Sequence, residues 1–280
     1  MNAPKTVLLL SDNPGEDYIA RLRSGISSTI GASGCILSSV NVYGKQESVA
    51  DVLRSMTYAG VVLTPPVSDD RHILSLIEAS KTPYVRIAPL LDPERGNVVS
   101  MDEFQAASAI TGLLTSRGHR RVAIMRGPNS QLVSMRRYNG YTNALGAKGI
   151  RVDQALVAQG DFTRKSGQEQ AAKLFAAKPT AIFASNDEMA AGIIDAAREA
   201  GISIPRDISI VGYDDNVVAS NVHPRLTTVR QPLEAMGEEA GRLIGERTRN
   251  PTKPNEYKVI DFEIVERDSV ADCRETVPAS

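Results

Sequence analysis

The feature of this chain that most constrains its fold is the alternation of short apolar runs with longer segments of helical periodicity. Each run is apolar at consecutive positions, and the clearest lie at 7–10, 35–40, 61–63, 84–87, 121–125, 181–184 and 208–213. Strands covered by helices on both faces have this pattern, whereas half-exposed strands alternate apolar and polar residues. The sequence therefore predicts an α/β fold built on doubly wound parallel sheets.

Segments with the period of an amphipathic helix separate these runs. We expect helices near 16–30, 46–57, 70–79, 102–118, 134–147, 165–177, 186–200 and 233–248, and further strands near 154–160 and 258–265. Asp102, with Gln105 three positions later, is typical of a helix start, and Gly118 is typical of a helix end. These βα units are too many for one small sheet, so the sequence predicts a larger assembly.

Composition excludes several classes of protein. The 280 residues are 42% apolar, and 32 basic and 33 acidic side chains are interspersed to give a formal net charge of −1. No segment therefore has the basic surface of a strong nucleic-acid binder. The first apolar run is too short for an export signal or a membrane span. Cys35 and Cys273 are far apart, which favours a reducing, cytoplasmic compartment, and we expect the polar tail after Arg267 to be frayed.

Polar side chains follow two of the apolar runs directly. Asn186 comes after the run 181–184, and Asp214 ends the run 208–213 with Asp215 next to it. The carboxyl ends of parallel strands are where such sheets open into a cleft, so polar groups there can bind a small molecule. This arrangement predicts a ligand-sensing domain.

The sequence does not favour catalysis. The three histidines, His72, His119 and His223, have no metal-ligand spacing, so we expect no metal site and no cofactor. A nucleophile elbow is missing, and the phosphate-loop pattern that begins at Gly160 fails at Arg164. Asp214 and Asp215 are adjacent in a turn and need not face each other across a bond. We therefore predict that the chain is not an enzyme.

A series of motifs, each weak alone, occurs in one fixed order. The motifs are Gly118-His119-Arg120-Arg121-Val122-Ala123, Arg137-Tyr138-Asn139-Gly140-Tyr141, Ala184-Ser185-Asn186-Asp187-Glu188-Met189-Ala190-Ala191-Gly192, Gly201-Ile202-Ser203-Ile204-Pro205-Arg206-Asp207, Val211-Gly212-Tyr213-Asp214-Asp215, Pro224-Arg225-Leu226-Thr227-Thr228-Val229-Arg230-Gln231-Pro232 and Val265-Glu266-Arg267-Asp268-Ser269. In this order the chain resembles the effector-binding core of the LacI/GalR family of bacterial transcription regulators. The resemblance runs from about Thr6 to Ser269.

This resemblance implies a periplasmic-binding-protein-like fold of two lobes joined by three crossings, with a ligand between the lobes. By analogy the N-terminal lobe is 1–101 plus 232–257, the C-terminal lobe is 102–231 plus 258–272, and 273–280 is a tail. It also implies a homodimer that controls operator DNA through a helix-turn-helix headpiece. Because Thr6 already begins the first core strand, we expect that headpiece to be absent, through truncation rather than natural loss.

The resemblance also implies ligand contacts. Asn186 and Asp214 match the two polar cleft positions, and Arg137 matches an arginine whose planar donors suit vicinal oxygens or a carboxylate. Phe162 and Tyr18 match two aromatic positions that stack on the ligand. The alternative for Asn186 is helix capping, and for the aromatic residues it is core packing.

Four further residues are candidates for the site. Asp12 and Asn13 follow the first strand and are predicted rim contacts or ordinary turn residues. Asp102 is predicted at the cleft, with helix capping as its alternative. Several sugar-binding relatives have an aspartate where this chain has Ala88, and Arg86 close by is predicted to compensate for it.

These residues predict a small-molecule effector that is a saccharide, with a sugar acid as the alternative because Arg86 and Arg137 are both cationic. Binding is expected to control DNA binding allosterically. The competing functions are a solute-binding protein that delivers a sugar to a transporter and, less favoured, a sugar-processing enzyme.

Overall fold

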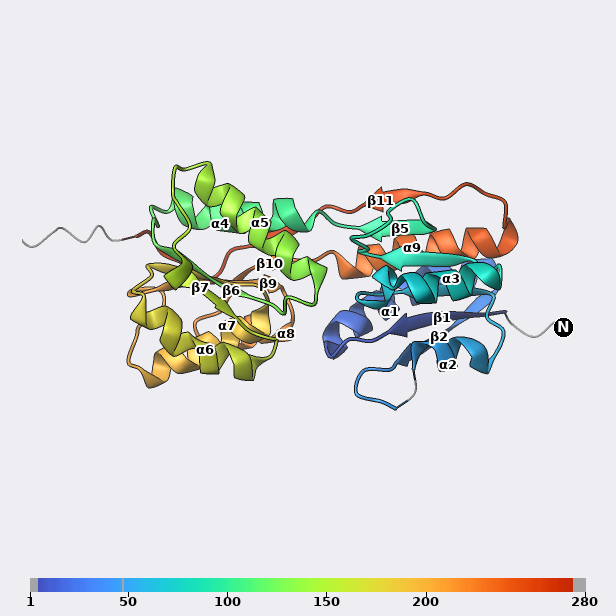
Figure 1. Ribbon diagram of the computed structural model, residues 1–280, viewed down its shortest axis with the longest axis horizontal. Helices are drawn as coiled ribbons and strands as arrows, with labels where there is room; N and C mark the ends of the chain where they lie inside the picture. Colours follow the sequence, from blue (N-terminus) through green and yellow to red (C-terminus); the bar gives the residue numbers. More distant parts are fainter. Residues whose placement is uncertain (1–4, 47, 274–280) are drawn as a thin grey trace, which may run out of the picture. The chain divides into compact units, whose positions relative to one another are not determined.

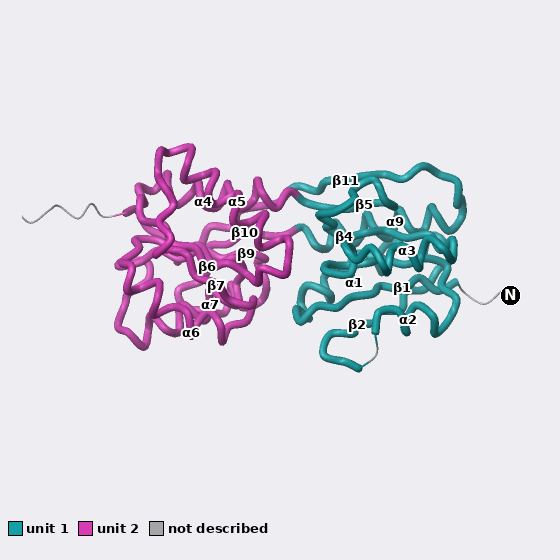
Figure 2. The backbone as a smooth tube through the Cα atoms, viewed as in Figure 1, with its two compact units in different colours: residues 1–101, 232–261 teal, residues 102–231, 262–280 magenta. Residues whose placement is uncertain are grey.

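The structure is a computed structural model that describes residues 5–46 and 48–273. The chain divides into two units, which Figure 2 shows in teal and magenta. Unit 1 comprises residues 1–101 and 232–261, and unit 2 comprises residues 102–231 and 262–280. The chain thus passes from one unit to the other three times, and each unit is assembled from separate parts of the sequence.

Unit 1 is built on a six-stranded sheet in the order β11-β5-β4-β3-β1-β2, and all its neighbouring strands are parallel. Its strands are β1 (Lys5–Ser11), β2 (Cys35–Asn41), β3 (Gly60–Leu63), β4 (Tyr84–Ile87), β5 (Asn97–Ser100) and β11 (Tyr257–Val259). The central strands β3, β4 and β5 are buried along their whole length, as their continuous apolar runs predict.

Helices cover the sheet of unit 1 (Figure 1). They are α1 (Glu16–Ile30), α2 (Val49–Ser55), α3 (Arg71–Ala79) and α9 (Leu233–Arg249). Helices α2 and α3 bury Val52 and Leu74 in one apolar cluster with Leu8 and Leu10 of β1. Helices α1 and α9 pack against each other, and α9 packs against β3, β4 and β5. Because strand side chains alternate between faces, both faces of this sheet are buried.

Unit 2 repeats this plan with a sheet in the order β12-β10-β9-β8-β6-β7. Its strands are β6 (Val122–Arg126), β7 (Val157–Gln159), β8 (Ala181–Ala184), β9 (Ser209–Asp214), β10 (Thr227–Arg230) and β12 (Glu263–Val265). All neighbouring strands are parallel except β12, which is antiparallel to β10. The predicted fold class, two doubly wound and mainly parallel sheets, is therefore confirmed.

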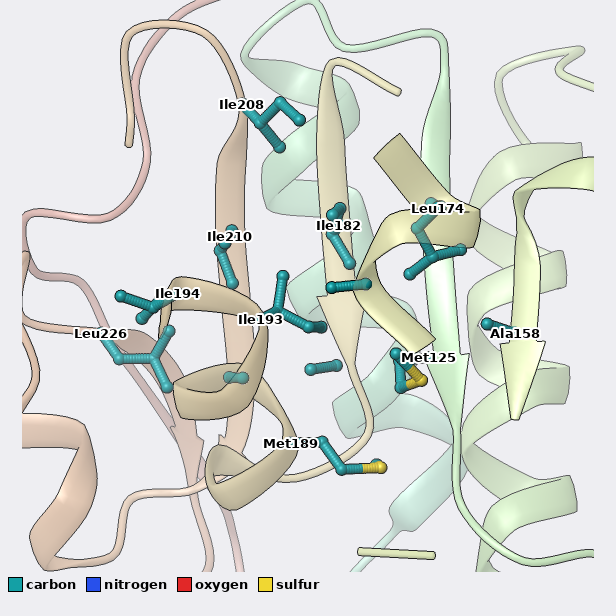
Figure 3. Close-up of a cluster of buried hydrophobic side chains, with 14 of the residues drawn as sticks. Met125, Ala158, Leu174, Ile182, Met189, Ile193, Ile194, Ile208, Ile210 and Leu226 are labelled. Carbon is teal, nitrogen blue, oxygen red and sulfur yellow. The ribbon is translucent and has the colours of Figure 1, made fainter. Parts of the chain in front are cut away.

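The helices of unit 2 lie on both sides of its sheet (Figure 1). They are α4 (Glu103–Ser116), α5 (Leu132–Gly146), α6 (Arg164–Ala176), α7 (Asp187–Glu199) and the short α8 (Val217–Asn221). Helices α4 and α5 pack together on one side, and α6 and α7 pack together on the other. Figure 3 shows the apolar cluster beneath α6 and α7, where Leu174 and Ile193 meet Ile182 and Ile210 of the sheet.

Two expectations at the C-terminal end of the chain are wrong. The strand expected at 258–265 is two strands in different sheets, because β11 pairs with β5 in unit 1 and β12 pairs with β10 in unit 2. Residues 258–261 accordingly belong to unit 1 and not to the C-terminal lobe expected from the resemblance. The sequence analysis also did not identify β5, β10 or α8.

The segment after Arg267 is not frayed as far as Cys273. Ser269 is fully buried, accepts a hydrogen bond from the Thr227 amide at 2.8 Å and donates one to the Ile210 carbonyl at 2.6 Å. The Cys273 amide donates to the Arg117 carbonyl at 2.8 Å. These bonds fix the segment against β9, β10 and the end of α4. The rest of the expected tail, 274–280, lies outside the described residues.

Glycines set the close approach of paired helices. A Cβ atom at Gly192 of α7 would lie 2.0 Å from the Arg164 carbonyl oxygen of α6, and one at Gly167 would lie 2.2 Å from the Met189 carbonyl oxygen. Both contacts are with backbone atoms, which cannot move aside as a side chain can. The helices α6 and α7 can therefore pack at this distance only with glycine at both positions.

Gly192→Ala should destabilise the protein by about 1–3 kcal/mol, because the added methyl group overpacks the contact of α6 with α7. Gly112→Ala in α4 is the matched control, since its added Cβ meets no atom within 4 Å. That control should stabilise the helix by about 0.5–1 kcal/mol. Urea unfolding monitored by circular dichroism measures both changes, and equal effects of the two substitutions would contradict this account of the helix contact.

Candidate functional site

The carboxyl ends of the strands of unit 2 bring four of the predicted site residues together. Phe162 follows β7, Asn186 follows β8, Asp214 ends β9, and Arg137 comes from α5. Arg137 Nη1 lies 3.7 Å from Asp214 Oδ1, and Arg137 Cζ lies 6.0 Å from the centre of the Phe162 ring. The Asn186 amide donates to the Phe162 carbonyl at 2.9 Å. This cluster is the candidate site.

Arg137 is the centre of the cluster and is fixed on several sides. Its Nε donates to Glu103 Oε2 at 2.9 Å, and its Nη2 donates to Glu103 Oε1 at 3.4 Å. Its Nη1 donates to the Ser185 carbonyl at 2.6 Å. The Tyr213 ring lies 3.7 Å from Arg137 Cζ, and the Tyr213 hydroxyl donates to Glu103 Oε2 at 2.6 Å. The Arg137 guanidinium is thus oriented by contacts from α4, β9 and the turn after β8, while α5 carries the residue itself.

The Arg137–Glu103 ion pair is buried, and each side chain is 6% exposed. Burial alone would lower the pKa of Arg137, but the charge of Glu103, with contributions from Tyr213 and Asp214, raises that pKa above its usual value. Burial and the neighbouring Glu103 charge likewise raise the pKa of Tyr213, so its hydroxyl remains a donor. Arg137 is cationic, and its charge is matched within the protein.

Glu103 is a site residue that the sequence analysis missed. It is the first residue of α4, directly after Asp102, whose carboxylate caps the helix by accepting from the Gln105 amide at 2.9 Å. Asp102 itself is exposed, and helix capping is the role that its contacts show. The signal for Glu103 was present, because it precedes the buried Ala107 by four positions and Ile110 by seven and so shares their helix face.

The turn after β9 positions Asp214. Asp214 and Asp215 have φ angles of 116° and 51°, and Gln231 Nε2 donates to Asp214 Oδ1 at 2.6 Å. Asp215 is bonded to Arg230 at 2.7 Å and to Arg267 at 2.5 Å. Burial opposes its ionisation, but these two arginines lower the pKa of Asp215 below its usual value. Asp215 therefore holds the turn, whereas Asp214 presents its carboxylate to Arg137.

Phe162 and Asn186 are positioned by each other. Phe162 has a φ angle of 71°, and the Asn186 side chain donates to its carbonyl while accepting from the Met189 amide at 2.9 Å. Asn186 thus caps α7, which is the alternative that the sequence left open, and both polar atoms of its side chain are already bonded. A Cβ atom at Gly127 would lie 2.1 Å from the Phe162 ring, so glycine there leaves room for the ring.

Asp187 is a second carboxyl group that the sequence analysis missed. It is fully buried, accepting from the Thr228 hydroxyl at 2.6 Å and from the Asn216 amide at 2.9 Å. Burial and the neighbouring charge of Asp214 raise the pKa of Asp187 well above its usual value. A Cβ atom at Gly212 would lie 2.2 Å from Asp187 Oδ1, so the glycine of that motif makes room for this carboxyl group. Asp187 joins α7 to β10 and to the turn after β9.

Four of the predicted ligand contacts lie in unit 1, namely Asp12, Asn13, Tyr18 and Arg86. Tyr18 is half-buried in the first turn of α1, and Asp12 is half-buried just after β1. Asn13 forms a local turn, because its side-chain oxygen accepts from the Gly15 amide at 2.7 Å. For Asp12, Asn13 and Tyr18, contact with a ligand stays a prediction.

Arg86 does not fit the ligand-binding role predicted for it. Its side chain is fully buried, and its guanidinium donates to the carbonyls of Ser68, Leu91, Asp92 and Arg95 and to the Asp69 carboxylate. These are five bonds for the five N–H donors of an arginine. Arg86 therefore shapes the loop between β4 and β5, and we withdraw it from the site.

Among residues 5–46 and 48–273, no group of three histidine, cysteine or acidic side chains could hold a metal ion. None of the helices in that part of the chain is long and apolar enough to cross a membrane. A depression of about 540 Å³ in unit 1 is lined by Lys81, Tyr84 and Arg95, but it includes none of the predicted site residues.

Comparison with known proteins shows the family of this chain. A family model described as a periplasmic binding protein-like domain matches residues 111–270. The HTH-type transcriptional regulator DegA of Bacillus subtilis is 33% identical over 233 residues, which cover 81% of this chain and 68% of DegA. The structure also matches the complex of the transcriptional regulator CelR with cellobiose, with a TM-score of 0.86 and 28% identity over 95% of this chain and 86% of that one.

A third similar protein is a LacI family transcriptional regulator from Enterococcus faecium with bound ribose. Its TM-score is 0.87 at 25% identity, over 96% of this chain and 100% of that one. The fold and the site thus define an effector-binding domain of the periplasmic-binding-protein type. The chain belongs to the LacI family of transcriptional regulators.

Asp187→Asn should change how stability depends on pH. An acid whose pKa is raised by folding stabilises the folded state below its unfolded pKa of about 3.9, and this contribution is lost as the pH rises towards the folded pKa. Asparagine never ionises. Its side-chain oxygen can still accept from the Asn216 backbone amide, and its NH₂ group can donate to the Thr228 hydroxyl. The variant should therefore gain stability relative to wild type as the pH rises from about 4, by about 1.4 kcal/mol for each unit by which the pKa of Asp187 is raised.

Urea unfolding at a series of pH values measures this gain. Asp187→Ala is the control, because it leaves both donors without an acceptor and should destabilise the protein at every pH. A stability difference between Asp187→Asn and wild type that does not change with pH would contradict a raised pKa.

Proposed function

We propose that this chain is the effector-sensing core of a cytoplasmic LacI-type regulator, and that its effector is a neutral saccharide. Binding of the saccharide changes the affinity of a dimer for operator DNA, which a helix-turn-helix domain reads. The observation that carries the proposal is the Arg137–Asp214 pair at the carboxyl edge of the unit 2 sheet, with Nη1 and Oδ1 3.7 Å apart.

This pair suits a polyol. A guanidinium has five N–H donors, and Arg137 uses three of them on Glu103 and Ser185, which leaves two for hydroxyl oxygens. The carboxylate of Asp214 accepts hydroxyl protons. A donor and an acceptor so close together match the two roles of neighbouring hydroxyl groups on a sugar ring. The half-buried Phe162 ring offers an apolar face for the C–H side of the same ring.

The charges favour a neutral saccharide over a sugar acid. The sugar-acid alternative depended on Arg86 and Arg137 together, and all five donors of Arg86 are bonded within unit 1. Arg137 is paired with Glu103 and has Asp214 beside it. A carboxylated ligand would be a third acidic group near one guanidinium, which Coulomb repulsion disfavours.

Two similar structures support this class of ligand, since one regulator is bound to cellobiose and another to ribose. DegA and these two proteins are transcriptional regulators, which favours a sensor over the alternative of a transporter's solute-binding protein. In a regulator, the effector acts by binding one conformational state more tightly than another.

A thermal-shift screen of neutral mono- and disaccharides, followed by calorimetric titration, tests the proposal. A bound saccharide should raise the unfolding temperature by mass action. Asp214→Asn should weaken its binding by about 10- to 100-fold, because a hydrogen bond to a charged acceptor contributes about 1.5–3 kcal/mol. Asp272→Asn is the control, since that side chain is 84% exposed, and it should leave binding unchanged. Equal weakening by both substitutions, or binding of nucleosides alone, would overturn the proposal.

A further inference from the structure

We infer that Glu103 is a positioning residue that sets the charge selectivity of the site. By pairing with Arg137, it makes the core reject acidic sugars that an unpaired arginine would accept. This inference rests on the proposed function and extends it, because it names the residue that separates neutral effectors from acidic ones.

Glu103 acts through Arg137 and not on the ligand. Its carboxylate oxygens are bonded to Arg137 Nε and Nη2 and to the Tyr213 hydroxyl, and its side chain is 6% exposed. No ligand-sized group can reach those oxygens without displacing Arg137 or Tyr213. The influence of Glu103 on a ligand is therefore its effect on the charge and orientation of the guanidinium.

The geometry explains why an acid is rejected. A carboxylate binds arginine best through two parallel N–H bonds, and the Nε and Nη2 edge provides one such fork. Glu103 occupies this edge with contacts of 2.9 and 3.4 Å. On the other side, Asp214 Oδ1 lies 3.7 Å from Nη1, and the Ser185 carbonyl accepts from the same nitrogen. One donor of Nη1 and one of Nη2 remain for hydroxyl oxygens. A ligand carboxylate at these donors would lie beside the negative charges of Glu103 and Asp214, which repel it.

Glu103→Gln tests this inference, with D-glucose and D-glucuronate and then D-galactose and D-galacturonate as matched pairs. Glutamine has the shape of glutamate, still accepts from Arg137 and can still bond to the Tyr213 hydroxyl, but it carries no charge. In calorimetric titrations, wild type should bind the neutral member of a pair at least about tenfold more tightly than the acid. Glu103→Gln should bind the acid about tenfold more tightly than wild type does, with a smaller change for the neutral sugar.

Two control variants separate charge from structure. Tyr213→Phe removes a hydrogen bond to Glu103 but keeps the carboxylate charge, so it should keep the preference for the neutral sugar. The double variant Glu103→Gln with Arg137→Gln removes both charges and should lose the gain in acid binding. A merely structural role of Glu103 would weaken both members of a pair equally in every variant.

A probe that is not a sugar keeps the inference independent of the proposed function. In nitrogen-15 spectra, the Arg137 Nε–H signal of Glu103→Gln should shift on addition of acetate, whereas that of the wild-type protein should not. If wild type binds no saccharide, the proposed function fails and the acetate titration still decides this inference. Acetate shifts equal in the two proteins would overturn it. Acid binding by wild type as tight as neutral binding would overturn it even if the variant does not fold.

Discussion

The buried ion pair between Arg137 and Glu103 is the interaction on which the candidate site depends. Each partner is 6% exposed, so neither charge has enough water around it to be stable alone. Removing one member of such a pair costs about 3–5 kcal/mol, because the other charge is left buried without compensation. The Tyr213 hydroxyl and the Ser185 carbonyl complete the hydrogen bonding of the pair. The site therefore has a fixed guanidinium at the end of a parallel sheet.

Two acidic residues contact Arg137 and have different tasks. Glu103 fixes the orientation and balances the charge of Arg137, and Asp214 beside Arg137 supplies an acceptor. The same strand, β9, carries both Tyr213 and Asp214, so two consecutive residues of one strand contact Arg137. Glycine at 212 in that strand makes room for the buried Asp187. The motif around Tyr213 thus has a packing role that does not depend on a ligand.

The sequence predicts most of the fold because buried parallel strands leave continuous apolar runs, as at 181–184, and helices leave a periodic face. It fails at 258–265, where one strand is expected but β11 ends at Val259 in unit 1 and β12 begins at Glu263 in unit 2. It fails at Arg86 because an arginine near the end of a strand has the same local signal whether its donors face a ligand or five protein oxygens. Helical periodicity places Glu103 on the buried face of its helix. Its role could not be predicted, because a buried carboxylate needs a partner and the pattern does not show that Arg137 of α5 is that partner.

A crystal structure of this chain with a bound saccharide tests the central claim most directly. We predict ligand hydroxyl oxygens within hydrogen-bonding distance of both Arg137 and Asp214, with the Arg137–Glu103 contact of 2.9 Å kept in the complex. A saccharide bound away from these residues, or one that separates Arg137 from Glu103 to reach the guanidinium, would contradict the account.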